Sequence, residues 1–467
     1  MKKYWINSTL LISFSLWAGT LSAQQTNNFS VKQAVDYAMK NATQVKNALL
    51  DIKVQEQVNR QITSNAFPQV NGSIGSTNYM NIPVQSLPNF ISPATYQVLV
   101  DEGVKNGNGT PVKFPNGGDF GTIAAKFGVP WTASAGIDVS QLLFDGQVFV
   151  GLMARDAVLE FYKKTADVTQ EQIKANVMKV YYQLVVAKSQ LASLDANIGR
   201  FEKLLHDTRE IYKNGFAEKL DVDKVTVQLN NIKTEKEKIE NTIAAGNSGL
   251  KFLMGMPQKE VLVLSDTLGE AELKSNILDE TYDYKSRKEF QLLTVAEKLG
   301  EYNIRRYKLS KIPTVAAFAS YSKNAQRSSF NFFNKGDWFT TSLVGVKIAI
   351  PIFDGNRKNS FIQQSKYELQ KTKNNIEQLK NSIDYDVDQS RIKMKSALLT
   401  MDNQKKNIVL AENVYNTTKK KYEQGLGSNQ EIYNAQTELK VAQTNYYSSL
   451  YDAITARIDY LKAAGKL

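Results

Sequence analysis

The apolar positions along the chain are most regular between Ile173 and Tyr212, where the steps between them alternate between four and three residues. This repeat averages 3.5 residues and predicts a long helix in a left-handed supercoil. Its members are Ile173, Val177, Val180, Leu184, Ala187, Leu191, Leu194, Ile198, Phe201, Leu205, Thr208 and Tyr212. Adding 210 to each number recovers the same register, which begins at Ile383 and ends at Tyr422. The pattern therefore predicts two copies of one long coiled-coil helix.

A strict alternation of apolar and polar residues predicts strands in other parts of the chain. Trp131 to Leu143 places apolar residues on one face, interrupted only by Gln141, and small or polar residues on the other. Such alternation over about ten residues is typical of a transmembrane β-strand, and a half-buried strand of a soluble sheet would also show it. We expect four strands, at about 67–80, 131–144, 312–322 and 338–353.

The order of these elements indicates a structural duplication. A first repeat, 24–257, and a second, 283–467, are joined by a linker, 258–282. Each repeat is read as helix, strand, loop, strand, long helix, turn and helix. The first helical stretches are expected at 29–66 and 284–309.

Short motifs recur at matching places in the two repeats. Phe144-Asp145-Gly146 corresponds to Phe353-Asp354-Gly355 at the strand ends, and a Tyr-x-x-Gly run closes each long helix. The turns are expected at about 212–221 and 422–431. Gly215 and Gly425 lie where a helix commonly ends on a left-handed residue.

The stretch from 81 to 130 interrupts this symmetry. It holds six of the ten prolines of the chain and two Asn-Gly-rich runs, so its breakers predict a long loop. Loops of this length are usually functional or mobile. We therefore expect a surface loop in this stretch.

The N-terminus is typical of an exported protein. Lys2 and Lys3 precede a mostly apolar run that ends in Ser22-Ala23, so residues 1–23 are predicted to be a cleaved signal peptide. No later apolar run is long enough for a transmembrane helix. The chain has no cysteine, which excludes disulfides and thiol chemistry.

Composition argues against catalysis and nucleic-acid binding. His206 is the only histidine and the chain has no cysteine, so one chain lacks the ligands for a His/Cys zinc site. A Ser-His-Asp triad could use only His206, which lies within the heptad repeat. We expect no catalytic residues, no metal and no cofactor. The net charge of +12 would suit nucleic acid, but Lys and Glu are mixed along the helices, which favours solvated helix faces.

Geometry restricts what four membrane strands can do. A bacterial barrel needs at least about eight strands, and an open strand edge is not tolerated in lipid. The chain therefore either assembles with other copies or keeps its strands out of the membrane. Helices of about 70 residues span roughly 105 Å and would project far beyond a bilayer.

In the order and duplicated spacing of these features, essentially the whole mature chain resembles the TolC family of outer-membrane efflux proteins. The resemblance implies a mainly α fold with a membrane β-barrel. Duplicated antiparallel coiled-coil helices would form an α-barrel, and four strands per chain would complete a 12-stranded barrel in a homotrimer. It also implies a location in the outer membrane with a periplasmic extension. The partners would be outer-membrane lipid, a periplasmic adaptor and an inner-membrane transporter, with no nucleic acid.

The resemblance also implies sites at the two turns. Tyr422, Glu431 and Asn434 correspond to positions where family members close the tunnel with aromatic and acidic residues. Their equivalents in the first repeat are Tyr212, Asp221 and Lys224, and the adaptor would dock at the tips marked by Gly215 and Gly425.

Simpler roles exist for the same residues. Glu431 lies three residues after Ser428, so it can belong to a capping box, and both tyrosines continue the heptad and can serve packing. The implied function is an exit duct of a tripartite efflux or type I secretion system. The alternative is a periplasmic coiled-coil adaptor or scaffold, although adaptors usually carry one helical hairpin and this chain carries two.

Overall fold

A computed structural model describes most of the 467-residue chain. The described residues are 26–117, 120–266, 273, 281–334 and 336–467. The expected signal peptide, 1–23, lies outside them, as do 267–272 and 274–280 of the expected linker.

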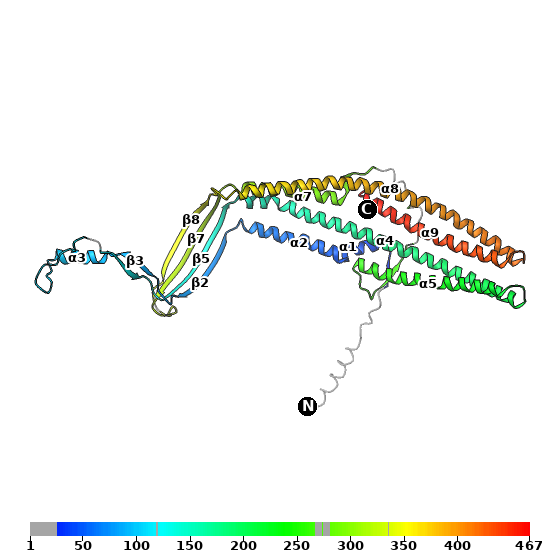
Figure 1. Ribbon diagram of the computed structural model, residues 1–467, viewed down its shortest axis with the longest axis horizontal. Coiled ribbons are helices and arrows are strands. Elements are labelled where there is room, and N and C mark those ends of the chain that lie inside the picture. Colours follow the sequence, from blue (N-terminus) through cyan, green and yellow to red (C-terminus); the bar gives the residue numbers. More distant parts are fainter. Residues whose placement is uncertain (1–25, 118–119, 267–272, 274–280, 335) are drawn as a thin grey trace, which may run out of the picture. The chain divides into compact units, whose positions relative to one another are not determined.

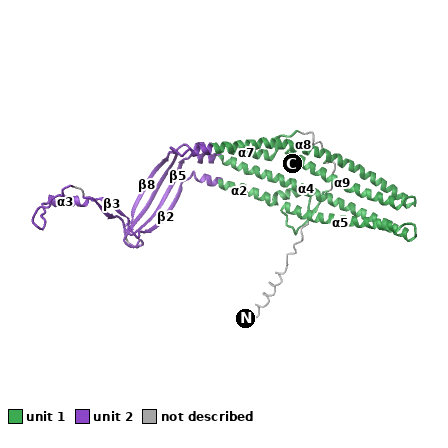
Figure 2. Ribbon diagram, viewed as in Figure 1, with its two compact units in different colours: residues 1–58, 154–304, 363–467 green, residues 59–153, 305–362 purple. Residues whose placement is uncertain are grey.

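The chain forms two compact units, and each takes segments from both sequence repeats (Figure 2). The helical unit comprises residues 1–58, 154–304 and 363–467, and the strand unit comprises 59–153 and 305–362. The repeats seen in the sequence are therefore not separate globular bodies. None of the described helices is both long and apolar enough to cross a membrane.

The strand unit is built on one antiparallel sheet (Figure 1). Its order is β2 (Gln69–Asn78), β5 (Trp131–Phe144), β7 (Thr314–Arg327) and β8 (Phe339–Ala349). β7 continues beyond the expected end at 322, because it pairs with β5 as far as Arg327 opposite Trp131. β2 and β8 are the two edge strands of this sheet.

The stretch expected to be a long loop contains regular structure. It holds β3 (Val84–Pro88), α3 (Ile91–Asp101) and β4 (Thr122–Lys126). β3 and β4 form an antiparallel pair of their own. Four of the prolines misled the prediction, because they are compatible with the elements beside them. Pro83 and Pro130 directly precede strands and Pro88 ends β3. Pro93 lies in the first turn of α3, where no helix hydrogen bond is lost.

The two long helices begin in the same way, which explains the repeated Phe-Asp-Gly motif. α4 (Gly146–Lys213) follows Asp145, whose Oδ1 accepts from the backbone N–H of Gln147 at 2.7 Å. α8 (Arg357–Glu423) follows Asp354, whose Oδ2 accepts from the backbone N–H of Lys358 at 3.1 Å. Each carboxylate satisfies a free N–H at the positive end of its helix.

The predicted heptad register is confirmed in both long helices. All twelve predicted positions of α8 are buried or half-buried, and in α4 the exception is Tyr212, which is 44% exposed. The returning helices are α5 (Lys219–Met254) and α9 (Asn429–Ala463). Near the turns the two hairpins share one core, in which Phe201, Ile232 and Leu439 are fully buried or nearly so.

The start of each repeat contains more elements than expected. The helix expected over 29–66 is divided into α1 (Val31–Asn41) and α2 (Thr43–Ser64), because Ala42 has a non-helical ψ of 127°. β1 (Thr26–Phe29) pairs in parallel with β6 (Val261–Leu264), the apolar run of the expected linker. In the second repeat a 3₁₀ turn, η1 (Tyr284–Ser286), precedes α7 (Lys288–Leu309).

Candidate functional site

One face of the four-stranded sheet is apolar and exposed. Residues paired across antiparallel strands lie on the same face, and the pairs Val70–Val139, Val139–Ala319 and Ala319–Val344 cross all four strands. Exposure is high at the edges, with Ile74 at 91%, Val344 at 84% and Ile348 at 60%. An exposed apolar surface of this extent marks an interaction surface.

The opposite face of the sheet is mainly polar. Its cross-strand rows are Asn71, Asp138, Ser320 and Leu343; Ser73, Gly136, Ser322 and Thr341; and Gly75, Ser134, Asn324 and Phe339. Most of these side chains are small, hydroxylated or amides, and Asp138 is the one carboxylate in these rows. This sheet could therefore separate an apolar phase from water.

The two turns between the helices have the same backbone. Gly215 and Gly425 have φ of +80° and +76°, which L-residues with a Cβ rarely adopt. In the second turn the N–H of Gly425 donates to Tyr422 O at 3.0 Å and that of Leu426 to Lys421 O at 2.9 Å. The first turn makes the equivalent pair of bonds, so both predicted glycines end their helices as expected.

Tyr422 lies at a polar contact between three helices. Its hydroxyl donates to Asn429 Oδ1 at 2.7 Å, and Thr208 Oγ1 lies 3.3 Å from the same oxygen. Thr208 belongs to α4 and is fully buried. Burial is the main cause that raises the pKa of Tyr422, and Asp207 and Asp221 raise it further against an opposing hydrogen bond from Thr208. The contact connects α8, α4 and the start of α9.

Glu431 contributes its backbone rather than its carboxylate to the cap of α9. Its N–H donates to Ser428 Oγ at 3.2 Å. Among the described residues no reciprocal bond from the Ser428 N–H to the Glu431 carboxylate is made, so the predicted capping box is only half formed. The carboxylate is exposed and is available for another role.

The four remaining predicted residues have three different surroundings. Lys224 and Asn434 are joined through Gln430, which accepts from Lys224 at 3.3 Å and donates to Asn434 at 2.8 Å. Asp221 accepts from the Glu218 N–H at 3.3 Å and completes the capping box of α5. The side chain of Tyr212 takes part in none of these bonds and is 44% exposed.

Sequence reasoning missed the side chains that connect these residues. Asn429 and Gln430 carry the contacts from the second turn to α4 and α5. Thr208 was recognised only as a heptad position. A polar residue at a heptad position was the available clue, because such a residue usually has a specific partner.

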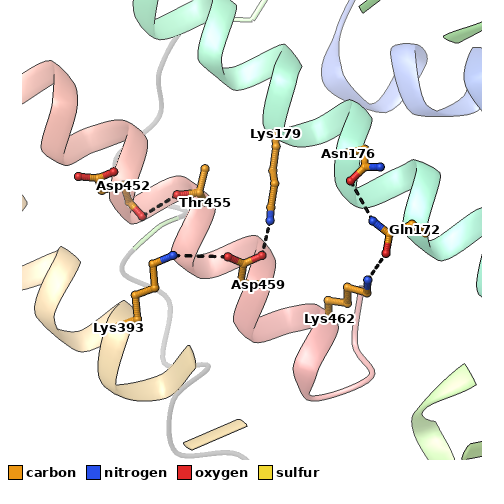
Figure 3. Close-up of polar contacts among 8 residues, drawn as sticks. All are labelled: Gln172, Asn176, Lys179, Lys393, Asp452, Thr455, Asp459 and Lys462. Carbon is orange, nitrogen blue, oxygen red and sulfur yellow. Dashed lines mark hydrogen bonds and ion pairs between the residues drawn. The ribbon is translucent and has the colours of Figure 1, made fainter. Parts of the chain in front are cut away.

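A second polar cluster joins three helices farther from the turns (Figure 3). Asp459 of α9 accepts from Lys179 of α4, and its other oxygen lies 3.8 Å from the ammonium of Lys393 on α8. Lys462 donates to Gln172 of α4. Ion pairs as exposed as these add little stability singly. Together they connect α4, α8 and α9.

Comparison with known proteins gives consistent matches. Residues 286–466 match the family described as Outer membrane efflux protein. TolC of Vibrio cholerae is 19% identical over 338 residues, which is 72% of this chain and 77% of that protein. The proteases secretion protein PrtF of Dickeya chrysanthemi is 21% identical over 207 residues, which is 43% of this chain and 44% of that protein.

The fold also matches solved structures. The CmeC outer membrane channel of Campylobacter jejuni has a TM-score of 0.71 at 15% identity, covering 96% of this chain and 91% of that chain. At this identity the likeness shows the fold. The predicted fold class, with duplicated long helices and four strands per chain, is confirmed.

Proposed function

Because the chain belongs to the TolC family of outer-membrane efflux proteins, we infer that it is the outer-membrane exit duct of a tripartite efflux or type I secretion system. It is a homotrimer that works with a periplasmic adaptor and an inner-membrane transporter. It lies in the outer membrane with a periplasmic extension. The similarity to a proteases secretion protein supports protein cargo beside small molecules.

The observation that carries this inference is the sheet with one exposed apolar face, one polar face and two edges. In lipid the edge backbone groups of β2 and β8 must be paired, and the described residues of one chain supply no partner for them. Three copies joined edge to edge give twelve strands, which enclose an aqueous lumen. The apolar face then meets lipid and the polar face lines the lumen.

Assembly is the first test of this function. In mild detergent the protein should run as a trimer by light scattering, because the edges pair only between copies. A stable detergent-solubilised monomer with an intact β-sheet circular dichroism signal would contradict the proposed duct. It would favour the alternative of a periplasmic coiled-coil adaptor, whose strands need no closure.

The orientation of the sheet has its own test on β8. Ile348→Arg should destabilise the trimer by about 2–4 kcal/mol if position 348 lies near the bilayer midplane. Thr341→Arg is the matched control, because it places the same side chain on the polar face of the same strand. Equal tolerance of both variants, measured by trimer melting in lipid, would mean that neither face contacts hydrocarbon.

We propose further that the helical turns form the gate. In the trimer Tyr212, Asp221, Lys224, Tyr422, Glu431 and Asn434 would surround the narrow end of the tunnel, with Gly215 and Gly425 at the tips that meet the adaptor. Three exposed Glu431 carboxylates close to one axis would attract cations, as acidic rings do in channels. Tyr422, Asn429 and Thr208 would hold the closed arrangement.

We also propose that the chain catalyses no reaction. Its single histidine, His206, is exposed on α4, and the chain has no cysteine. No group of metal-ligating side chains occurs among the described residues. Energy for transport would come from the partner transporter. Substrate turnover by the purified trimer alone would contradict this proposal.

A further inference from the structure

The segment between β2 and β5, residues 81–130, has an unusual burial pattern. It contains β3, α3 and β4, and we call it the external module. Within its described residues, 81–117 and 120–130, no residue is buried. A two-stranded hairpin is marginally stable at best, and a segment this small rarely buries enough surface to fold alone. The module therefore needs a surface to pack against.

The module has one internal cluster. The ring of Tyr96 on α3 lies edge-on to Phe114 and tilted to Phe120, with ring centroids 6.4 and 5.7 Å away, and the two phenylalanines lie 5.4 Å apart. These contacts hold the loop after α3 against one side of the helix. None of the described residues covers the other side of α3.

That uncovered side is apolar. Ile91 and Val98 lie on one stripe of α3, seven residues apart, and are 55% and 61% exposed. Phe90, directly before the helix, is 60% exposed, and Val84 of β3 is 54% exposed. Exposed apolar groups gathered on a small module mark a contact surface.

The position of the module in the chain limits what can cover this stripe. It leaves the sheet between Asn78 and Trp131, and its base is closed by a 2.7 Å bond from the Tyr79 N–H to Pro130 O. At this end the apolar face of β2 has already changed to Ser76 and Asn78. The module therefore begins at the edge of the apolar band, where Trp131 pairs with Asn78 and tryptophan is typical of the membrane–water interface. Attachment there argues against hydrocarbon as the cover of the module.

The module also begins at an edge. β2 is an edge strand of the sheet, and in the trimer this edge meets the next copy. Three modules are thus attached at the three seams between copies. Tethering at adjacent sites gives a high effective concentration, so even a weak contact between modules would be occupied.

We propose that the Ile91–Val98 stripe of each external module packs against the module of the next copy, so that three modules form a collar around the external mouth of the duct. The proposal rests on the trimer of the proposed function. It assigns to residues 81–130 an interaction surface whose partner is a second copy of this chain.

Photo-crosslinking of the purified trimer tests the collar. Val98→p-benzoylphenylalanine should yield covalent dimers and trimers on denaturing gels after irradiation. Gln97→p-benzoylphenylalanine is the matched control, because it is exposed, polar and about 100° away around the same helix. It should yield few adducts. Ile91→p-benzoylphenylalanine provides a second position on the stripe if substitution at Val98 disturbs assembly.

Thiol labelling distinguishes a neighbouring copy from lipid or detergent as the surface that covers the Ile91–Val98 stripe. The chain has no cysteine, so Val98→Cys and Gln97→Cys each introduce a single thiol. Maleimide should label Gln97→Cys in the trimer and label Val98→Cys only after unfolding. Protection of Val98→Cys without copy-to-copy adducts would mean that lipid or detergent covers the stripe, and it would overturn the collar.

Failure of the collar is distinguishable from failure of the duct. An intact trimer with no adducts at Val98 and Ile91 overturns the collar and leaves the duct unaffected. An unsubstituted protein that forms no trimer overturns both. Adducts at Val98 and Ile91, together with protection of Val98→Cys, support the collar.

Discussion

Tyr212 and Tyr422 occupy equivalent positions in the two repeats, three residues before the glycine of each turn, yet their surroundings differ. Tyr212 is 44% exposed, whereas Tyr422 is half-buried and donates to Asn429. The acidic residues differ as well. Asp221 uses its carboxylate in a cap, whereas Glu431 is exposed and contributes its backbone N–H to a cap.

The difference arises from the neighbours of each turn rather than from its backbone, which is the same in both. Tyr422 meets Thr208, a residue 214 positions earlier in the chain, whereas the Tyr212 side chain is 44% exposed. The two repeats thus share the backbone geometry of the turn, whereas the side-chain contacts of each turn depend on the helices packed against it. We infer that the second turn holds the gate closed and that the first turn chiefly supports it.

The largest expected effect concerns the core that supports both turns. Phe201 is fully buried and lies edge-to-face with Tyr433, so Phe201→Ala should lower the free energy of unfolding by about 3–5 kcal/mol. Tyr212→Ala, eleven residues later in the same register, should change it by no more than about 0.5 kcal/mol. Denaturant unfolding followed by helical circular dichroism measures both. Similar losses would show that Tyr212 is buried in the trimer and would remove the contrast between the turns.

The two tyrosines provide the next test. Tyr422→Phe removes the bond to Asn429, and a net hydrogen bond of about 0.5–1.5 kcal/mol corresponds to about a two- to tenfold shift toward the open state. Tyr212→Phe should have no such effect. The readout is resting conductance in a planar bilayer. Equal conductance of the two variants would mean that the turns contribute equally to closure.

Ion selectivity compares the two acidic residues. Glu431→Gln removes an exposed charge while the cap of α9 stays, because Ser428 binds the backbone of residue 431. Cation preference, measured as the reversal potential in a salt gradient, should fall. Glu431→Ala should lower the cation preference as much as Glu431→Gln does, because both variants remove the charge. Asp221→Asn should affect selectivity less, since that carboxylate is engaged with Glu218. If Glu431→Gln behaves like wild type and only the alanine variant is impaired, Glu431 acts as a helix cap.

The smallest expected effect is a pH dependence of the second turn. Burial raises the folded-state pKa of Tyr422 above its ordinary value of 10.0. Because the pKa of Tyr422 is higher in the folded state, its contribution to stability is complete at pH values below its pKa in the unfolded chain. That contribution is lost as the pH rises through its pKa in the folded state. Closure should therefore weaken in the alkaline range above pH 10. Tyr422→Phe has no group to ionise there and should flatten the pH profile. A profile unchanged by Tyr422→Phe would assign the alkaline effect to another residue.

The sequence by itself determined the features that depend on periodicity. The alternating steps of four and three correctly predicted that the positions from Ile173 to Thr208 and from Ile383 to Tyr422 are buried or half-buried. The prediction holds because an apolar stripe on a helix packs away from water, whatever element it packs against. Alternation separated Val344 and Ile348 from Thr341 on β8 for the same reason. The turns were predictable because Gly215 and Gly425 satisfy a local backbone requirement.

Tertiary structure decided the contacts between residues far apart in the chain. Asn429 meets Thr208 across 221 positions, and β1 pairs with β6 across more than 200. No local pattern records such pairs, since each residue alone fits several environments equally well. The external module shows the same limit: its prolines predicted a loop, and the pairing of β3 with β4 made it a hairpin that carries a helix. Periodicity is a property of one segment, whereas a contact depends on two.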